Sequence, residues 1–330
     1  MKQEHIDQVK AAVAAAAERV QAGRAKRIYF VACGGSQASM MPARYLFDRE
    51  ANIPAAIYTA NEFNYATPSG FDADTIVVTC SHSGTTPETV AAAQKATDEG
   101  ALSIAFSNAV DSPLWKAAEF PIHYDHGDEA VDSDKCGALM LRLWFELMKL
   151  FDADNAARWD AGINSIEKLA EVKKAASDLY RDRAVAFASE NKRATTIYTM
   201  GSGANYGEMY SLAICLFMEM QWINSNCIHS GEYFHGPFEV TDYDVPFVIT
   251  VGNGATRHLD ERALAFAKKF SDRLFVIDEN DFDFGDIDES VREYLAPEVL
   301  SAVVRVMVDA LAHDRGHALS VRRYMWQMEY

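Results

Sequence analysis

The sequence predicts an α/β protein built from two similar domains in tandem. Its 330 residues are 49% hydrophobic, which is enough to fill the cores of two ordinary domains. β-rich runs alternate with helical patterns in both halves, and this alternation is typical of parallel sheets made of βαβ units. An internal repeat relates the two halves. We therefore expect two doubly wound, flavodoxin-like parallel sheets, each flanked by helices.

The internal repeat pairs three β-rich runs of the first half with three of the second. The runs "RIYFVACGGSQ" from Arg27 and "TIYTMGSGANY" from Thr196 both lead through a glycine and serine turn into a helical pattern. The run "TIVVTCSHSGTT" from Thr75 corresponds to "PFVITVGNGATR" from Pro246, and "ALSIAFSN" corresponds to "RLFVIDEN".

Helical patterns occupy the regions outside these runs. They cover the charged, amphipathic start of the chain, residues 134–151, residues 159–191 and the stretch "PEVLSAVVRVMVDALAHDRG". We expect the C-terminal tail to pack back onto the fold near the functional site, because Tyr324 and Trp326 are too apolar to remain in solvent. The patterns predict a first domain at residues 1–152 and a helical linker at 153–192. A second domain at 193–315 and the tail at 316–330 follow.

Charge and cysteine content limit the possible partners. The formal net charge of −17 argues against nucleic acid or an anionic membrane, whose nonspecific attraction depends on lysine and arginine. No apolar stretch approaches the roughly 20 residues that a membrane span requires. The five cysteines lack CxxC spacing and are expected to be free thiols. These features predict a soluble, cytoplasmic protein.

Two loops of the first half, "CGGSQ" and "SHSGTTPE", are suited to hold an anion. In a parallel sheet such loops follow the carboxyl ends of strands, and Pro87 is suited to begin the next helix. Hydroxyl groups, free backbone N–H groups and the helix dipole would then converge on a phosphate. The alternative is that these serines and threonines only cap helices and form turns. Because the second half has the plainer loop "VGNGATR", we expect one phosphate site, in the first domain.

An acidic residue, Glu219, interrupts the apolar run "LAICLFMEMQWI". Since apolar residues surround it on nearly every side of the expected helix, we expect it to be buried or to line a cavity. Such surroundings disfavour a charged carboxylate and suit the group to moving protons near neutral pH. Pairing with a structural arginine or a backbone group is the alternative.

The loop "HSGEYFHGP" follows this run and contains His229, Glu232 and His235. Gly231 and Gly236 interrupt any helix that would align the three side chains, so no metal site is expected. A histidine sixteen positions after a buried acid suggests proton transfer. Neither half carries a GxGxxG fingerprint, so no nicotinamide cofactor is expected.

These motifs resemble the SIS, or sugar isomerase, family of phosphosugar enzymes, which includes the isomerase half of glucosamine-6-phosphate synthase. The resemblance is closer still to the fructosamine-6-phosphate deglycases, through "FMEMQW", "IHSGEYFHGPFEV" and the ending "RRYMWQMEY". It extends over nearly the whole chain. The start "MKQEH" does not match the glutaminase of the synthase, so deglycation or deamination is expected rather than synthesis.

The resemblance implies two SIS domains and a reaction without metal or cofactor. A 6-phosphorylated fructose-amino acid would be cleaved to glucose 6-phosphate and the free amino acid. Glu219 and His235 would be the catalytic residues, and a homodimer with the active site near the subunit interface is expected. The implied phosphate ligands are Gly35, Ser36, Ser81, Ser83 and Thr86. His82 and Glu232 are further candidates for substrate contact. Candidates for the pocket rim or for binding the amino acid's carboxylate, each with a surface role as the alternative, are Asp134, Lys135, Arg322 and Arg323.

Two other functions remain open at this point. A phosphosugar aldose-ketose isomerase or an aminosugar-phosphate deaminase could use the same acid and histidine. A sugar-phosphate sensor would need only the phosphate loops, although the sequence shows no helix-turn-helix pattern and a sensor would leave Glu219 without a role.

Overall fold

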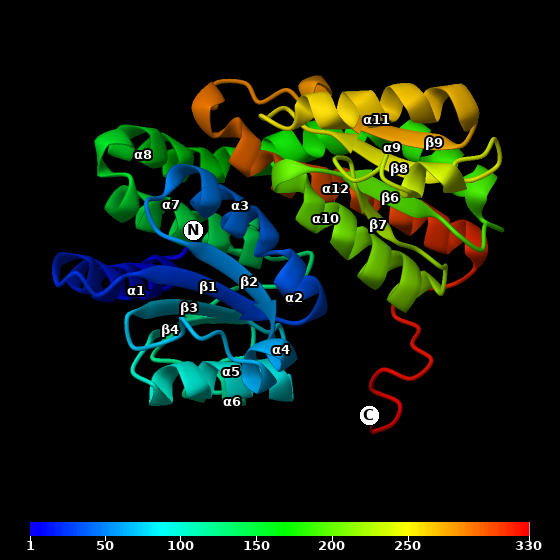
Figure 1. Cartoon of the computed structure of the whole chain (residues 1–330). Helices are drawn as coiled ribbons and strands as arrows, with labels where there is room; N and C mark the ends of the chain where they lie inside the picture. The colour runs from blue at the N-terminus through cyan, green and yellow to red at the C-terminus, as the bar shows by residue number, and fades with distance from the viewer. Residues whose placement is uncertain (330) are drawn as a thin grey trace. The chain divides into compact units, whose positions relative to one another are not determined.

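The computed structural model describes residues 1–329 and divides into two compact units. Unit 1 comprises Met1–Ala170 with Ile287–Val291, and unit 2 comprises Glu171–Asp286 with the remainder of the chain from Arg292. Each unit contains one parallel sheet with helices on both faces (Figure 1). The predicted fold class of two α/β domains is therefore confirmed.

Unit 1 contains a five-stranded parallel sheet in the order β2-β1-β3-β4-β5, which is the flavodoxin-like order. Its strands are β1 (Arg27–Ala32), β2 (Ala55–Thr59), β3 (Thr75–Cys80), β4 (Leu102–Ser107) and β5 (Phe120–His123). Its helices are α1 (Gln3–Gln21), α2 (Gly34–Ala38), α3 (Met41–Glu50), α4 (Ala60–Tyr65), α5 (Pro87–Asp98), α6 (Pro113–Ala117), α7 (Cys136–Phe151) and α8 (Ala156–Ser165).

Both faces of this sheet are covered, which explains why its central strands read as continuous apolar runs. Every residue of β3 and β4 is buried. Side chains alternate along β1, so that Tyr29 and Val31 pack with Phe63 of α4 while Phe30 meets Trp144 of α7 edge to face. Figure 1 shows α4, α5 and α6 on one side of the sheet and α3 and α7 on the other.

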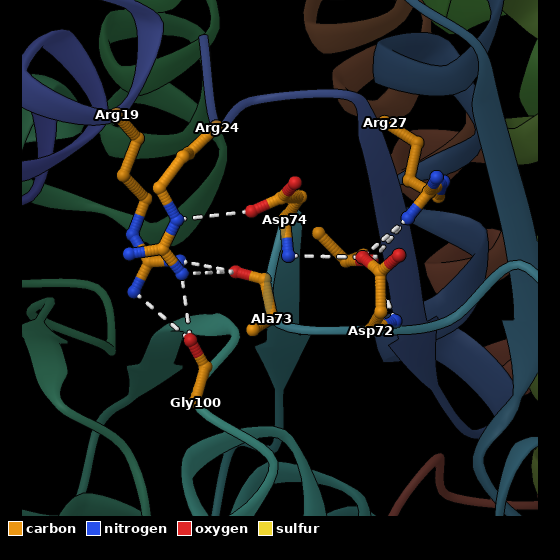
Figure 2. Close-up of polar contacts among 8 residues, drawn as sticks. Arg19, Arg24, Arg27, Asp72, Ala73, Asp74 and Gly100 are labelled. Atoms are coloured by element: carbon orange, nitrogen blue, oxygen red, sulfur yellow. Dashed lines mark hydrogen bonds and ion pairs between the residues drawn. The ribbon is translucent and has the colours of Figure 1, made fainter. Parts of the chain in front are cut away.

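Three arginines bind the loops at the amino ends of these strands (Figure 2). Arg19, near the end of α1, donates to the carbonyl oxygens of Ala73 and Gly100 at 2.7 and 3.2 Å. Arg24 pairs with Asp74 at 3.0 Å, and Arg27 pairs with Asp72. All three guanidinium groups already have acceptors within the protein. This edge of the sheet is therefore a structural junction between the start of the chain and the loops before β3 and β4.

Unit 2 contains a four-stranded parallel sheet in the order β7-β6-β8-β9. Alternate residues of β9 face opposite sides, with Val276 packed against the core cluster that includes α11 and Phe275 stacked on Phe187 of α9. Its strands are β6 (Tyr198–Gly201), β7 (Cys227–His229), β8 (Phe247–Val251) and β9 (Leu274–Asp278). Its helices are α9 (Leu169–Asn191), α10 (Tyr206–Ser211), the π-helix Leu212–Met220, α11 (Arg257–Phe270) and α12 (Glu289–Arg315), of which α9 and α12 start within unit 1.

The internal repeat corresponds to real structural repetition. In the three predicted pairs of runs, β1 corresponds to β6, β3 to β8 and β4 to β9. The order β2-β1-β3-β4 in unit 1 matches the order β7-β6-β8-β9 in unit 2, and only β5 has no counterpart in the second sheet. Three strands, β2, β5 and β7, were not predicted because they are short and only partly buried. No helix within residues 1–329 has the length and apolarity needed to cross a bilayer. None of the five cysteines forms a disulfide within residues 1–329.

The turn after β3 depends on Gly84, which has a positive φ of 65°. A Cβ atom built there would lie 2.0 Å from Ser112 Oγ and 2.7 Å from Ser107 Oγ. The Gly84 carbonyl also accepts a hydrogen bond from Leu114 N at 2.9 Å, which ties the turn to the start of α6. Only glycine fits this position, for reasons of both backbone conformation and space.

Substitution of Gly84 by alanine tests this constraint. We expect Gly84→Ala to destabilise the protein by more than about 2 kcal/mol, because left-handed strain and overpacking act together. Gly23→Ala is the matched control, since Gly23 has a φ of 70° with no atom within 4 Å of the added Cβ. Its cost should be about 1 kcal/mol. Melting temperatures of the two variants measure the difference, and equal losses would contradict the packing argument.

Candidate functional site

The two loops predicted to hold a phosphate lie side by side at the carboxyl edge of the first sheet. Ser36, in the first turn of α2, forms a side-chain hydrogen bond with Cys80 at the end of β3. Thr89 Oγ1 of α5 approaches Cys33 Sγ at 4.0 Å. Gly35 is the neighbour of Ser36 in the same half-buried turn. The topology therefore brings "CGGS" and "SHSGTT" together from positions about fifty residues apart.

The hydroxyl groups of the second loop pair mainly with one another. Ser81 Oγ lies 2.8 Å from Thr86 Oγ1, and Ser83 Oγ lies 2.8 Å from Thr85 Oγ1. Thr86 occupies the position before α5, yet its hydroxyl makes no capping hydrogen bond. The alternative that this threonine serves only as a helix cap is therefore not supported by its geometry.

Free backbone donors accompany these hydroxyl groups. Within residues 1–329, the N–H groups of Ser83, Thr86 and Glu88 have no acceptor in the protein. They lie at the start of the twelve-residue helix α5, where the helix dipole favours negative charge. This arrangement of neutral donors is able to bind a phosphate group without a lysine or arginine side chain.

His82 is exposed beside this loop, and its ring is held by the segment that follows β5. Its Nδ1 atom lies 3.1 Å from Tyr124 Oη, and its ring meets His126 edge to face at 4.4 Å. Loss of hydration lowers the pKa of His82, and the neighbouring His126 lowers it further. A neutral ring predominates at pH 7. No motif around Tyr124 indicates this contact from the sequence.

In the equivalent loop of the second half, carboxyl groups of the protein already accept hydrogen bonds from the backbone. The N–H groups of Gly252, Asn253 and Ala255 donate to Asp260 at 3.1 Å, Glu279 at 2.9 Å and Glu293 at 3.3 Å, respectively. These internal acceptors occupy three N–H groups of the loop, which are then not free for an external anion. The expectation that only the first domain provides a phosphate site is therefore consistent with the donors that each loop leaves free.

Glu219 lies in the π-helix Leu212–Met220 and has 22% of its side chain exposed. Its Oε1 atom pairs with Arg322 Nη2 at 2.8 Å, and the Arg322 side chain is only 6% exposed. Glu219 is thus largely buried, and the C-terminal tail adds a buried cation to the apolar side chains of its own helix. Pairing with an arginine, the alternative considered from sequence, is what the structure shows. Oε2 accepts no hydrogen bond within the described part of the chain.

The loop around His235 is a series of turns over residues 231–236. His235 N donates to the carbonyl of Glu232 at 2.9 Å, and both side chains are exposed. No hydrogen bond links His235 to Glu219 within residues 1–329. His229 has a structural role, because its Nδ1 accepts from Gly231 N at 3.0 Å and its ring lies against Tyr206.

The remaining candidates have contacts of their own. Lys135, at the start of α7, pairs with Asp132 at 3.0 Å and is 38% exposed. The Arg323 guanidinium lies 4.2 Å from the centre of the Trp222 ring. Arg323 therefore lies close to the end of the π-helix, because Trp222 follows Met220 closely in the chain.

The buried acid Glu279 generates a prediction about pH. Burial raises its pKa to about 8, and the nearby carboxylates of Asp260 and Glu293 contribute in the same direction. An unfolded glutamate titrates near pH 4.3, so the folded protein holds the extra proton between about pH 4.3 and 8. Stability should therefore fall as pH rises through this window, by up to about 1.4 kcal/mol per pH unit.

Glu279→Gln removes this titration while keeping an acceptor for Asn253 N. We expect the variant to gain stability relative to the native protein as pH rises from 5 to 8, measured by melting temperature. The exposed substitution Glu239→Gln is the control and should show no such trend. A pH-independent difference between Glu279→Gln and the native protein would contradict a proton held on Glu279.

Comparison with known proteins identifies relatives of the whole chain. The SIS domain matches residues 23–141. Fructosamine deglycase FrlB of Bacillus subtilis is 46% identical over 304 residues, which are 92% of this chain and 92% of that protein. Fructoselysine 6-phosphate deglycase of Escherichia coli K12 is 29% identical over 300 residues, which cover 90% of this chain and 85% of the relative.

Solved structures agree with these relatives. A Bacillus subtilis protein provisionally assigned as a phosphosugar isomerase superposes with a TM-score of 0.90 at 44% identity, over 97% of this chain and all of that one. A Salmonella typhimurium protein with the same provisional assignment gives a TM-score of 0.91 at 34% identity, over 100% and 98% of the two chains. The chain therefore belongs to the SIS-domain family that includes the fructosamine deglycases.

Proposed function

We propose that this protein is a fructosamine-6-phosphate deglycase, which cleaves a 6-phosphorylated fructose-amino acid to glucose 6-phosphate and the free amino acid. The observation that carries the proposal is the 46% identity to fructosamine deglycase FrlB over 92% of both chains. The neutral donors at the start of α5 support it, since they suit the phosphate of such a substrate.

The phosphate would be bound by the loops after β1 and β3. We assign this role to the hydroxyl and N–H groups of the five predicted residues, of which Ser81 and Thr86 already share a hydrogen bond of 2.8 Å. His82 would hold the loop through Tyr124 rather than carry charge to the substrate. The complete list is Gly35, Ser36, Ser81, Ser83 and Thr86.

Proton transfer at C1 and C2 of the sugar would be the work of Glu219 and His235. Removal of a C1 proton gives an enaminol, and protonation at C2 gives an imine at C1. Water then adds to the imine and releases the amine, leaving the aldehyde of glucose 6-phosphate. We assign His235 as the base or ring-opening group and Glu219 as the acid. Arg322 pairs with Oε1 of Glu219, so Oε2 is the oxygen that would exchange a proton with the sugar.

The test is turnover of a defined substrate. The purified protein should release glucose 6-phosphate from fructoselysine 6-phosphate or fructose-aspartate 6-phosphate, detected by a coupled dehydrogenase. Comparison of the two substrates reports on the amine that it prefers. Interconversion of glucose 6-phosphate and fructose 6-phosphate without deglycation would contradict the proposal and indicate an isomerase.

Substitution of the two proposed catalytic residues tests their roles. We expect Glu219→Gln and His235→Ala each to lower kcat by about 10² to 10⁴ fold while the affinity for glucose 6-phosphate, measured by calorimetry, is retained. Glu239→Gln, at an exposed position shortly after His235, is the matched control and should retain full activity. Near-normal turnover in either catalytic variant would remove that residue from the assignment.

We also propose that the protein acts as a homodimer in the cytoplasm. The expected packing of Tyr324 and Trp326 onto the fold is not present in the single chain, where these two side chains and Met328 are 63%, 75% and 60% exposed. Exposed apolar surface of this kind is typical of a covered interface. The five free thiols are consistent with a reducing compartment.

Light scattering after size-exclusion chromatography measures the assembly. The native protein should have twice the mass of one chain, and replacing the three tail residues by serine should shift it toward the monomer. A monomeric native protein would contradict the dimer, and an unchanged mass in the triple variant would exclude the tail as its interface.

A further inference from the structure

Three potential metal ligands converge in unit 1, apart from the loops described above. They are His5 near the start of α1, His123 at the end of β5, and Asp125 in the loop that follows. Their ligand atoms all lie within 4.8 Å of one another. His5 and His123 are 118 positions apart in the chain, which is why no spacing motif predicts the cluster.

The distances match those around a tetrahedral metal ion. His5 Nε2 lies 3.3 Å from His123 Nδ1. Two nitrogens bound to zinc at about 2.0 to 2.1 Å with tetrahedral angles would be separated by about 3.3 to 3.4 Å. Asp125 Oδ1 lies 3.9 Å from His5 Nε2, so a small rotation of the carboxylate brings it to the third position.

The surroundings orient His5 as a ligand. Its side chain is 1% exposed, and its Nδ1 lies 2.9 Å from Asp134 Oδ1, which leaves Nε2 pointing toward His123. A carboxylate on the distal nitrogen of a histidine is the usual support of a metal ligand, because it fixes the tautomer and raises the basicity of the ring. Asp134 is itself held by Lys2 N at 2.6 Å, and its carbonyl accepts from Asp125 N at 2.8 Å.

We propose that His5 Nε2, His123 Nδ1 and the Asp125 carboxylate form a binding site for a divalent transition metal of the zinc type, with water as the fourth ligand. Two imidazoles and one carboxylate suit such ions better than magnesium or calcium, which favour oxygen ligands. The Lys2 ammonium, 2.6 Å from Asp125 Oδ2, occupies the other carboxylate oxygen. The metal fastens α1 to the segment that carries Tyr124, and its role is structural and separate from the proposed reaction.

A chain of hydrogen bonds from Asp134 through His5 to His123 is the competing explanation, and metal titration distinguishes the two. The full-length protein is freed of metal with a chelator and titrated with Co²⁺, followed by competition with Zn²⁺. The proposal predicts one equivalent of bound Co²⁺ with the visible absorption of a tetrahedral nitrogen and oxygen site. An intense sulfur-to-cobalt band in its place would assign the ion to cysteine and overturn the proposal, as would the lack of any bound equivalent.

Variants test the assignment of the ligands. His123→Ala and the polar variant His123→Gln should each weaken Co²⁺ binding at least tenfold, and Asp134→Asn should weaken it about 10- to 100-fold by releasing His5. His126→Ala is the matched control, since His126 is exposed in the same loop and should bind like the native protein. Circular dichroism verifies that each variant is folded. Unchanged affinity in both His123 variants, or an equal loss in His126→Ala, would overturn the site.

Discussion

The proposed phosphate site depends on which groups accept hydrogen bonds from the backbone N–H groups in the loops after the parallel strands. After β3, the side chains of the loop pair mainly with one another, and the N–H groups of Ser83 and Thr86 have no acceptor within residues 1–329. After β8, three carboxyl groups of the protein accept from the N–H groups of Gly252, Asn253 and Ala255. The two halves of the repeated fold thus leave different N–H groups free, and we propose that only the first half binds an anion.

This difference suits a chain with a net charge of −17. Several arginines already have acceptors inside the protein, as do Arg19 and Arg27 at the amino edge of the first sheet (Figure 2). Arg257 pairs with Asp278, and Arg322 pairs with Glu219. Hydroxyl and amide groups can bind a phosphate without a further cation. In this protein such donors lie at the start of α5.

Much of this arrangement could be predicted from sequence, and the failures have physical reasons. The buried runs of β1, β3 and β4 are apolar and regular, so their repetition in β6, β8 and β9 could be recognised in the sequence. The partner of Glu219 was not, because Arg322 lies more than one hundred positions away and only the folded tail brings it there. The contact of Tyr124 with His82 and the meeting of His5 with His123 likewise join distant segments. Local patterns predict strands and loops, whereas such pairs follow from tertiary topology.

The central claim is that an anion binds to the neutral donors of the first half and not to the loop of the second. A crystal structure of the protein with glucose 6-phosphate measures this directly. The account predicts phosphate oxygens within hydrogen-bond distance of Ser81, Ser83 or Thr86 and no phosphate at Gly252–Ala255. A phosphate bound at the second loop, or held by a lysine or arginine away from α5, would contradict it.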